Sequence, residues 1–294
     1  MIKYFSLFSG IGGLEKGLEK AGHECVGTSE IKKSSSVIYA KHYPKVHNYG
    51  DITMIKPEMM PDFDMLIGGF PCQSFSLAGL RNGLNDGKGI MIFYIRNFLV
   101  AKKPRYFVLE NVKGLLSHDD GRTYVKICKL LQTAGYQFRV ILLNSAVYGS
   151  AQARERIFFL GCQDDFPLVK PRVVDMSKKF KDVFDELGTY KEINKTPRNE
   201  IKMEQKHVRN FEVIGMHDRV GTLTTQYGCG EKAVPEADWF RYLTVLECER
   251  LQGFPEGWTE GIGTNDRYFA LGNAVNCYVS EYLFTEYLPE VWGI

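Results

Sequence analysis

The stretch of sequence that decides the fold is KYFSLFSGIGGLEKGLEKAG, residues 3–22. Its apolar run at residues 4–8 leads into Gly10-Ile11-Gly12-Gly13, and apolar residues then recur at helical spacing up to Gly22. A buried strand, a glycine turn and a helix in this order are typical of open α/β sheets that bind nucleotide-like ligands at the turn. The spacing G-x-G-G differs from the G-x-G-x-x-G dinucleotide fingerprint, which argues against a nicotinamide cofactor.

Glu30 lies at the end of the next apolar run, where an acidic side chain can bind the two hydroxyls of a ribose. The other interpretation is a bare glycine turn followed by a solvated carboxylate. The residues alone leave both open.

Further apolar runs extend the pattern along the first half of the chain. We expect buried strands not only at Tyr4–Phe8 but also at Glu24–Thr28, Met65–Ile67, Tyr106–Leu109, Val140–Leu143 and Ile157–Leu160. Helical spacing fills the intervals, for example around residues 92–99 and 124–131. The alternation predicts an α/β fold with a doubly wound, mostly parallel sheet.

After Gly161 this alternation is lost, and polar, Lys-rich, proline-containing sequence follows. We therefore expect a smaller, irregular domain at residues 166–267. Helical apolar spacing returns from Tyr268 to Leu288, and this segment is predicted to pack back on the sheet as a closing helix. The larger domain would then comprise residues 1–165 and 268–294.

The composition is that of an ordinary folded protein, with 44% hydrophobic and 24% charged residues among 294, which excludes disordered and collagen-like chains. No apolar stretch reaches the roughly 20 residues of a membrane helix, and the N-terminus lacks a secretion signal, so we expect a cytoplasmic protein. The seven cysteines include no C-x-x-C pair and the six histidines no metal-ligand spacing. We expect reduced thiols and no metal.

The net charge is only +2, but residues 170–210 hold eleven Lys/Arg against seven Asp/Glu, a local 11 − 7 = +4. A contact with a polyanion and a solvated surface stretch both fit this segment.

Gly68-Gly69-Phe70-Pro71-Cys72 follows the strand expected to end at Ile67. Sheets of this type place their chemistry at the carboxyl ends of the strands. A rigid turn containing Pro71 would present Cys72 there as a nucleophile. Without such a context, a lone cysteine is more often a small buried side chain.

Glu110 follows the strand Tyr106–Leu109 at the same edge, where partial burial would raise its pKa and favour proton donation; the alternative is a helix N-cap. Just before the strand Ile157–Leu160, alternation would send Gln152, Arg154 and Arg156 to one side. Two guanidinium groups aimed together suit an anion or a carbonyl oxygen, whereas isolated charges of this kind are more often in surface salt bridges.

Six blocks in a fixed order carry a resemblance that covers nearly the whole chain. They are the glycine turn, Gly69-Phe70-Pro71-Cys72-Gln73, Glu110-Asn111-Val112, Gln152-x-Arg154-x-Arg156, the stretch from Leu243 to Pro255, and Gly272-Asn273-Ala274-Val275. Together they resemble the DNA (cytosine-5) methyltransferase family of bacteria and phages. The resemblance implies a Rossmann-like, S-adenosylmethionine-dependent methyltransferase fold and makes the smaller domain a target-recognition domain.

The resemblance implies transfer of a methyl group from S-adenosylmethionine to carbon 5 of cytosine. The Cys72 thiolate would add to carbon 6 and so make carbon 5 nucleophilic. Glu110 would hydrogen-bond or protonate ring nitrogen 3 and hold the exocyclic amine. Arg154 would bind the ring oxygen, and Arg156 would support the same loop.

The cofactor-binding residues that the resemblance implies come from several segments. The glycine turn would bind the methionine part of S-adenosylmethionine, Glu30 its ribose and the residues near 31 and 51 its adenine. The alternative for Asp51 is a turn residue after Gly50. The full implied set is Phe8, Gly10, Ile11, Gly12, Glu30, Ile31, Asp51, Ile52, Pro71, Met91, Asn273 and Ala274.

Double-stranded DNA is the implied partner, and its cytosine has to be rotated out of the helix. The resemblance assigns DNA contacts to Ser76 and Gln152 and, in the target-recognition region, to Thr222 and Leu223. It implies a monomer that acts within a short specific sequence, as in restriction-modification or phage protection, where a restriction endonuclease acts on the same site.

Three rival interpretations remain. A tRNA cytosine-5 methyltransferase would share the catalytic blocks, but the Cys-Phe-Thr tripeptide of that branch is absent. A non-catalytic nucleic-acid-binding regulator would not need Cys72, Glu110 and Arg154 together. A nicotinamide oxidoreductase comes third.

Overall fold

The computed structural model describes residues 1–71, 91–167, 169–186, 196–197, 212–226, 232–235 and 239–294. The chain divides into two compact units. Unit 1 comprises Met1–Leu143, Glu155–Pro171 and Ser280–Ile294, and unit 2 comprises Asn144–Arg154 and Arg172–Val279. The expected domains, 1–165 with 268–294 and 166–267, divide the chain at other points and stay predictions.

Unit 1 alternates strands and helices. In chain order its elements are β1 Lys3–Leu7, α1 Gly13–Lys20, β2 Glu24–Ser29, α2 Lys33–His42, η1 Ile52–Met54, η2 Pro57–Met59, β3 Met65–Gly69, α4 Met91–Lys102, β4 Tyr106–Val112, η5 Lys113–Leu116, α5 Arg122–Gln132, β5 Gln137–Asn144, β6 Glu155–Cys162, η11 Leu283–Tyr287 and α10 Leu288–Trp292. The six predicted strands all correspond to strands of this unit.

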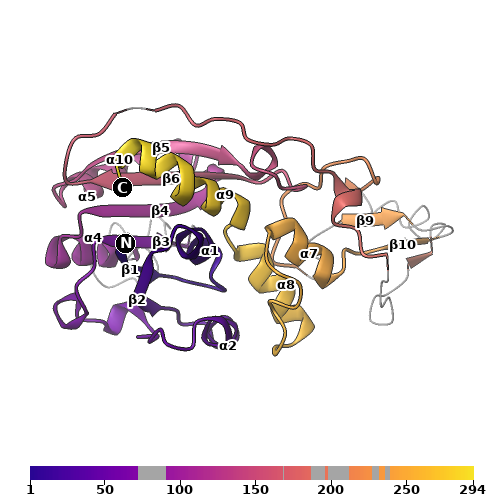
Figure 1. The fold of residues 1–294 in the computed structure, drawn as a ribbon, viewed down its shortest axis with the longest axis horizontal. Helices are drawn as coiled ribbons and strands as arrows, with labels where there is room; N and C mark the ends of the chain where they lie inside the picture. Colours follow the sequence, from indigo (N-terminus) through magenta and orange to yellow (C-terminus); the bar gives the residue numbers. More distant parts are fainter. Residues whose placement is uncertain (72–90, 168, 187–195, 198–211, 227–231, 236–238) are drawn as a thin grey trace. The chain divides into compact units, whose positions relative to one another are not determined.

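These strands form one six-stranded sheet in the order β2-β1-β3-β4-β6-β5 (Figure 1). Strand β1 pairs in parallel with β2 and β3, and β3 pairs in parallel with β4, whereas β6 runs antiparallel to β4. The predicted mostly parallel α/β sheet is therefore confirmed. Because β1, β3 and β4 run in the same direction, their carboxyl ends meet at one edge.

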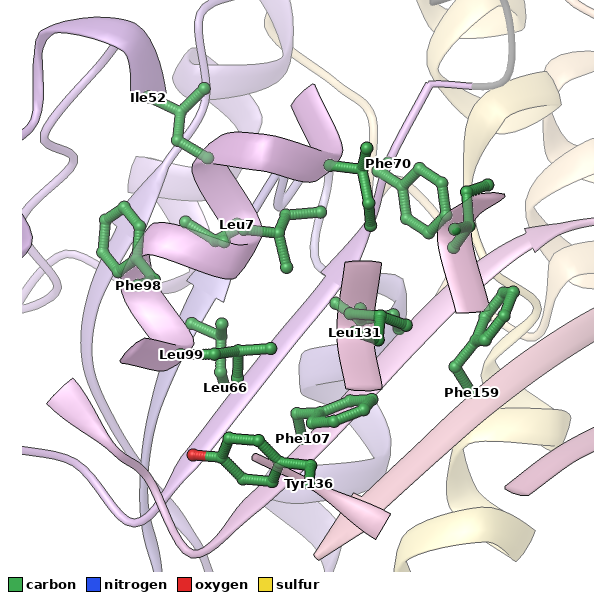
Figure 2. Packing of buried hydrophobic residues seen from close by; sticks show 14 of the residues in the cluster. Leu7, Ile52, Leu66, Phe70, Phe98, Leu99, Phe107, Leu131, Tyr136 and Phe159 are labelled. Carbon is green, nitrogen blue, oxygen red and sulfur yellow. The ribbon is translucent and has the colours of Figure 1, made fainter. Parts of the chain in front are cut away.

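Side-chain alternation along β1 shows that both faces of the sheet are covered. Leu7 is fully buried in a cluster with α4 residues such as Phe98 (Figure 2). Phe5, also fully buried, belongs to the same cluster. On the opposite face, Ser6 donates a hydrogen bond from Oγ to Oε1 of Glu15 on α1, at 2.6 Å. Helices on both faces make the sheet doubly wound, and each fully buried large apolar side chain contributes about 1.5–3 kcal/mol.

The closing helix is only partly as predicted. Helix α8, Thr264–Asn273, ends at Ala274, which is extended with φ −62° and ψ 146°, and α9 begins at Cys277 and runs to Tyr282. Because apolar residues keep their helical spacing across Ala274, the sequence pattern did not reveal the break between α8 and α9. Only the part from Ser280 onwards belongs to unit 1, where Ser280 Oγ donates to the carbonyl oxygen of Gly13 at 2.7 Å.

Unit 2 holds a small sheet that the sequence did not predict. Its strands, of two to four residues each, are β7 Thr196–Pro197, β8 Glu212–Val213, β9 Lys232–Pro235 and β10 Trp239–Arg241, in the order β7-β10-β9-β8. Its other elements are η6 Ser145–Val147, η7 Phe180–Asp182, α7 Val245–Gln252 and α8. Strands this short show no alternation that could be recognised.

Helix α7 begins with a capping box. Thr244 Oγ1 accepts a hydrogen bond from the Glu247 amide at 3.0 Å, and the Glu247 carboxylate accepts one from the Thr244 amide at 2.8 Å. The same carboxylate pairs with Arg241 at 2.8 Å, and both side chains are fully buried. The Thr-x-x-Glu pattern fixes where the helix starts, because each residue satisfies a backbone donor of the first turn.

The described residues include no helix long and apolar enough to cross a membrane.

Candidate active site

The turn between β1 and α1 leaves backbone open to a ligand. Gly10 and Gly12 have positive φ of 57° and 90°, a conformation that favours glycine. Nothing lies within 4 Å of where a Cβ on Gly10 would stand, whereas a Cβ on Gly12 would lie 2.8 Å from a ring carbon of Tyr43. The backbone of the turn is therefore open at Gly10, whereas at Gly12 it packs against the Tyr43 ring.

Glu30 is held against this turn. Its Oε2 accepts a hydrogen bond from the Gly10 amide at 2.8 Å, and its Oε1 accepts one from the Lys32 amide at 2.7 Å. The side chain of Asn48 bonds both the amide and the carbonyl of Glu30, each at 3.0 Å. Each carboxylate oxygen has a second lone pair, so Glu30 is oriented and able to accept bonds from ribose hydroxyls.

The residues expected around an adenine have different environments. Ile31 is 73% exposed, while Ile52 is buried in the core at 4%. Asp51 Oδ1 accepts a hydrogen bond from the Thr53 amide at 2.9 Å and so caps η1. The alternative interpretation of Asp51 as a turn residue is therefore confirmed, and its contact with the cofactor stays a prediction.

The remaining predicted cofactor residues are divided between the units. Phe8, with a positive φ of 55°, and the buried Ile11 belong to unit 1. Pro71 and Met91, also of unit 1, border the undescribed stretch 72–90, whereas Asn273 and Ala274 belong to unit 2.

Ser9 is a residue that sequence reasoning missed. Within the described part of the chain its Oγ is buried and has no hydrogen-bond partner. Buried polar atoms nearly always have one, so an orphaned hydroxyl next to Gly10 fits a polar ligand group. The amino and carboxylate groups of S-adenosylmethionine supply such groups, and the residues of this turn therefore fit that cofactor.

Behind the turn, α1 carries a buried carboxyl group. Glu15 is 1% exposed, and burial raises its pKa from 4.5 to about 7, against the opposing hydrogen bonds from Ser6 and Tyr39. The carboxylate of Glu30 adds a smaller upward effect. No apolar or polar pattern in the sequence distinguished Glu15 from the exposed Glu19 on the same helix.

We expect this carboxyl to make stability depend on pH. The folded state holds the proton more tightly than the unfolded chain, so the free energy of unfolding falls as pH rises from about 4.5 to 7 and is level above that. Replacing Glu15 by Gln should remove this pH dependence. Between pH 4.5 and 7 the free energy of unfolding of the variant should therefore rise by about 3 kcal/mol relative to that of the wild type. Urea unfolding at several pH values measures the difference. Glu19→Gln, on the exposed face, is the control expected to show little change, and a Glu15→Gln difference independent of pH would contradict the prediction.

Glu110 lies within β4, not after it, and is 8% exposed. Its Oε1 is 3.0 Å from Nε of Arg156 on the neighbouring strand β6. Its Oε2 would be 3.1 Å from a Cβ added to Gly69, which faces it across the β3–β4 pairing. The carboxylate thus has a cation on one side and needs glycine on the other. The sequence did not reveal this cation, and the raised pKa expected for Glu110 stays a prediction.

Asn111 joins the two strand ends. Its Nδ2 donates to the carbonyl oxygen of Phe70 at 2.9 Å, and the side chain is 2% exposed. This bond holds the chain directly before Pro71 against β4. Cys72 and Ser76 lie outside the described residues. The Glu-Asn-Val block contained Asn111, but its partner is a backbone group 41 residues away, which no spacing in the sequence indicates.

The expectation that Gln152, Arg154 and Arg156 share one side is wrong for Arg156, because Gln152 and Arg154 both bond Leu223 whereas Arg156 does not. Strand β6 begins at Glu155, so strand alternation does not apply to the two earlier residues. Arg154, in unit 2, donates to the carbonyl oxygens of Leu223, Gly272 and Ala274 at 2.8–3.0 Å, whereas Arg156 pairs with Glu110.

The predicted DNA-contact residues of unit 2 are bonded within that unit. Gln152 is fully buried, and its Oε1 accepts a hydrogen bond from the Leu223 amide at 3.2 Å. Leu223 is 1% exposed, and Thr222 Oγ1 donates to the carbonyl oxygen of Ala153 at 3.1 Å. These bonds give Gln152 and Leu223 a place inside the fold, and their contact with DNA stays a prediction.

The described residues hold no group of three or more His, Cys, Asp or Glu side chains that could bind a metal ion.

Comparison with known proteins points to one family. The family profile described as C-5 cytosine-specific DNA methylase matches residues 2–228 and 175–288. The Type II methyltransferase M.Bsp6I of Bacillus sp. (strain RFL6) is 33% identical over 302 residues, covering 94% of this chain and 95% of the relative. The Type II methyltransferase M.NgoBI of Neisseria gonorrhoeae is 32% identical, covering 96% and 91%.

Among solved structures, the S. pombe Dnmt2 methyltransferase is similar with a TM-score of 0.82, and the similarity covers 99% of both chains. Its sequence is 20% identical, so this likeness concerns the fold.

Proposed function

The chain belongs to the C-5 cytosine-specific DNA methylase family, and we propose on this basis how its residues carry out the reaction. It is an enzyme that transfers a methyl group from S-adenosylmethionine to carbon 5 of cytosine in DNA. When bound, the cofactor supplies an electrophilic methyl group on a sulfonium. Ser9, Gly10 and Glu30 would hold it, with Asn273 and Ala274.

In this proposal Cys72 is the nucleophile. Its thiolate forms a bond to carbon 6 of the cytosine, and the ring electrons move to carbon 5, which becomes nucleophilic. After methylation a base removes the proton from carbon 5, the ring double bond re-forms and the sulfur leaves carbon 6. What supports this role is the placement of the preceding residues, because Asn111 holds Phe70 at the strand end that carries Glu110.

We assign the base contacts to Glu110 and Arg156. In its protonated form Glu110 would donate a hydrogen bond to ring nitrogen 3 and accept one from the exocyclic amine. Arg156 would donate to the ring oxygen, the role that the resemblance gave to Arg154. The observation that carries the assignment is the 3.0 Å ion pair between Arg156 and Glu110. A guanidinium and a carboxyl group side by side match this edge of cytosine. The ring oxygen and nitrogen 3 accept hydrogen bonds there, and the exocyclic amine donates.

The wider setting is also part of the proposal. Two relatives that are similar over more than 90% of their own length are named Type II methyltransferases. In our proposal the chain is a cytoplasmic monomer that methylates a short specific sequence in double-stranded DNA, beside an endonuclease that acts on the same sequence. Ser76, Thr222 and neighbouring residues would contact the DNA, with the cytosine rotated out of the helix.

Bisulfite sequencing of DNA from cells that express the chain tests this proposal. We expect 5-methylcytosine at one short sequence and nowhere else. In parallel, purified protein with labelled S-adenosylmethionine is offered duplex DNA or bulk tRNA. Labelled tRNA with unlabelled DNA would overturn the DNA assignment, and no labelling of either would favour a non-catalytic nucleic-acid-binding protein.

A further inference from the structure

Arg154 is a buried cation whose bonds reach two separate segments of unit 2. Its side chain is 2% exposed, and Nη1 donates to the Leu223 carbonyl oxygen at 3.0 Å. Nη2 donates to the carbonyl oxygens of Gly272 and Ala274 at 2.8 and 3.0 Å. A buried guanidinium without partners is costly, so the segment around Leu223 and the segment around Ala274 are stabilised by the same charge.

Two glutamines connect the same segments a second time. Gln152 accepts a bond from the Leu223 amide at 3.2 Å and donates from Nε2 to Oε1 of Gln252 at 3.3 Å. Gln252 in turn donates to the carbonyl oxygens of Leu271 and, at 3.3 Å, of Ala274. Both glutamines are fully buried. A continuous hydrogen-bonded path therefore runs from the Leu223 amide to the Ala274 carbonyl.

The two segments are also in direct backbone contact. A Cβ added to Gly272 would stand 2.1 Å from the carbonyl oxygen of Thr224 and 2.7 Å from the Thr225 amide nitrogen. No side chain fits between them, so a shift of one segment is passed to the other.

We propose that this assembly of Gln152, Arg154, Gln252 and Gly272, the Arg154 junction, couples recognition of DNA to binding of the cofactor, with Arg154 as a positioning residue. The inference rests on the proposed function, in which Thr222 and Leu223 contact DNA and Asn273 and Ala274 contact S-adenosylmethionine. Ordering either segment by its ligand orders the other through the junction. By linkage, DNA then raises the affinity for the cofactor by the same factor as the cofactor raises that for DNA, about 5- to 150-fold in typical cases.

Calorimetric titration tests the coupling. The dissociation constant of S-adenosylhomocysteine is measured for the free protein and for its complex with a duplex that holds the target sequence, and their ratio is the coupling factor. We expect a factor of at least about 5 in the wild type. In Arg154→Lys it should fall at least about threefold, because a point charge with three donors does not bridge both segments as the planar guanidinium does, and only the glutamine path and the backbone contact remain. The affinity of the DNA-free protein for S-adenosylhomocysteine should change far less than the coupling factor does.

Arg250→Lys is the matched control. Arg250 also donates to carbonyl oxygens of unit 2, those of Val183 and Phe184 at 3.2 and 2.8 Å, but it does not join the two segments. Its substitution should leave the coupling factor as in the wild type. An unchanged factor in Arg154→Lys, or an equal loss in both variants, would overturn the inference.

A measurement on the unaltered protein decides the question if Arg154→Lys does not fold. S-adenosylhomocysteine alone, without DNA, should slow hydrogen exchange of the Leu223 amide about fivefold or more, because that amide bonds to Gln152 in the junction. Unchanged exchange at Leu223 in the cofactor-saturated protein would overturn the coupling. If neither ligand binds the wild type, the proposed function fails, whereas independent binding of both refutes the coupling alone.

Discussion

Replacing Cys72 by serine is expected to lower methyl transfer to duplex DNA by about 10⁴-fold or more, the scale seen when a covalent nucleophile is removed. Serine keeps the size and polarity of the side chain, but its hydroxyl is a far weaker nucleophile than a thiolate. Because the sulfur takes no part in holding the cofactor in our proposal, affinity for S-adenosylhomocysteine should change less than about threefold. Transfer of labelled methyl and calorimetry measure the two quantities.

Trapping gives the same prediction a second readout. With DNA that carries 5-fluorocytosine at the target base, the wild type should form a protein–DNA adduct that survives denaturation, since fluorine at carbon 5 cannot leave as a proton does. Cys72→Ser should form none. Cys25→Ser is the control, because Cys25 is partly buried in β2 and its substitution should leave the adduct unchanged. Activity retained in Cys72→Ser, or an adduct that depends on another cysteine, would refute the covalent role.

The strands of unit 1 were predictable because most of them contain a short, largely apolar run. Strands buried on both faces of a parallel sheet carry this signature without alternation. The ends were less certain: β4 continues through Glu110 to Val112, because backbone pairing with β6 does not stop where apolar residues stop. Glu110 therefore lies inside the strand and faces Gly69, which places it more firmly than a loop residue would be placed.

What could not be predicted were the partners of the charged residues. The bonds of Arg154 reach 69 to 120 residues along the chain, and local spacing contains no information on them. The prediction that Arg154 and Arg156 point together failed because it extended strand alternation to residues before the strand begins. The break at Ala274 was missed for a related reason, since helical apolar spacing also arises where two short helices each bury one face.

The second large effect concerns the pair of Glu110 and Arg156. We expect Glu110→Gln to lower the rate of methyl transfer by about 10²- to 10³-fold, the usual effect of removing one group that stabilises charge in the transition state. The amide can still accept a bond from Arg156, but the guanidinium loses its compensating charge, so Glu110→Gln should also lower the free energy of unfolding. Rates are therefore compared under conditions in which both proteins are folded. Single-turnover rates on saturating DNA measure the change. A decrease of less than threefold would exclude Glu110 from the reaction.

Arg156→Gln should lower both the free energy of unfolding and the rate of methyl transfer. The two measurements separate its ion pair with Glu110 from its contact with the ring oxygen of the base. The side chains of the pair are only 13% and 11% exposed, and removing one partner of a buried pair costs about 3–5 kcal/mol because the other charge loses its compensation. Lys113→Gln is the matched control: Lys113, the residue after β4, pairs at 2.8 Å with Glu155, the first residue of β6. These side chains are 52% and 40% exposed, so loss of the pair should cost less than about 1 kcal/mol.

The double variant Glu110→Gln/Arg156→Gln completes the argument, because it leaves no charge to compensate. Its stability should recover most of what Arg156→Gln loses, since a pair of neutral side chains carries no buried charge. Its rate should not recover, because in our proposal both groups contact the base. Recovery of rate together with stability would mean that Arg156 serves only to hold Glu110 in place, and the contact with the ring oxygen would then belong to another residue.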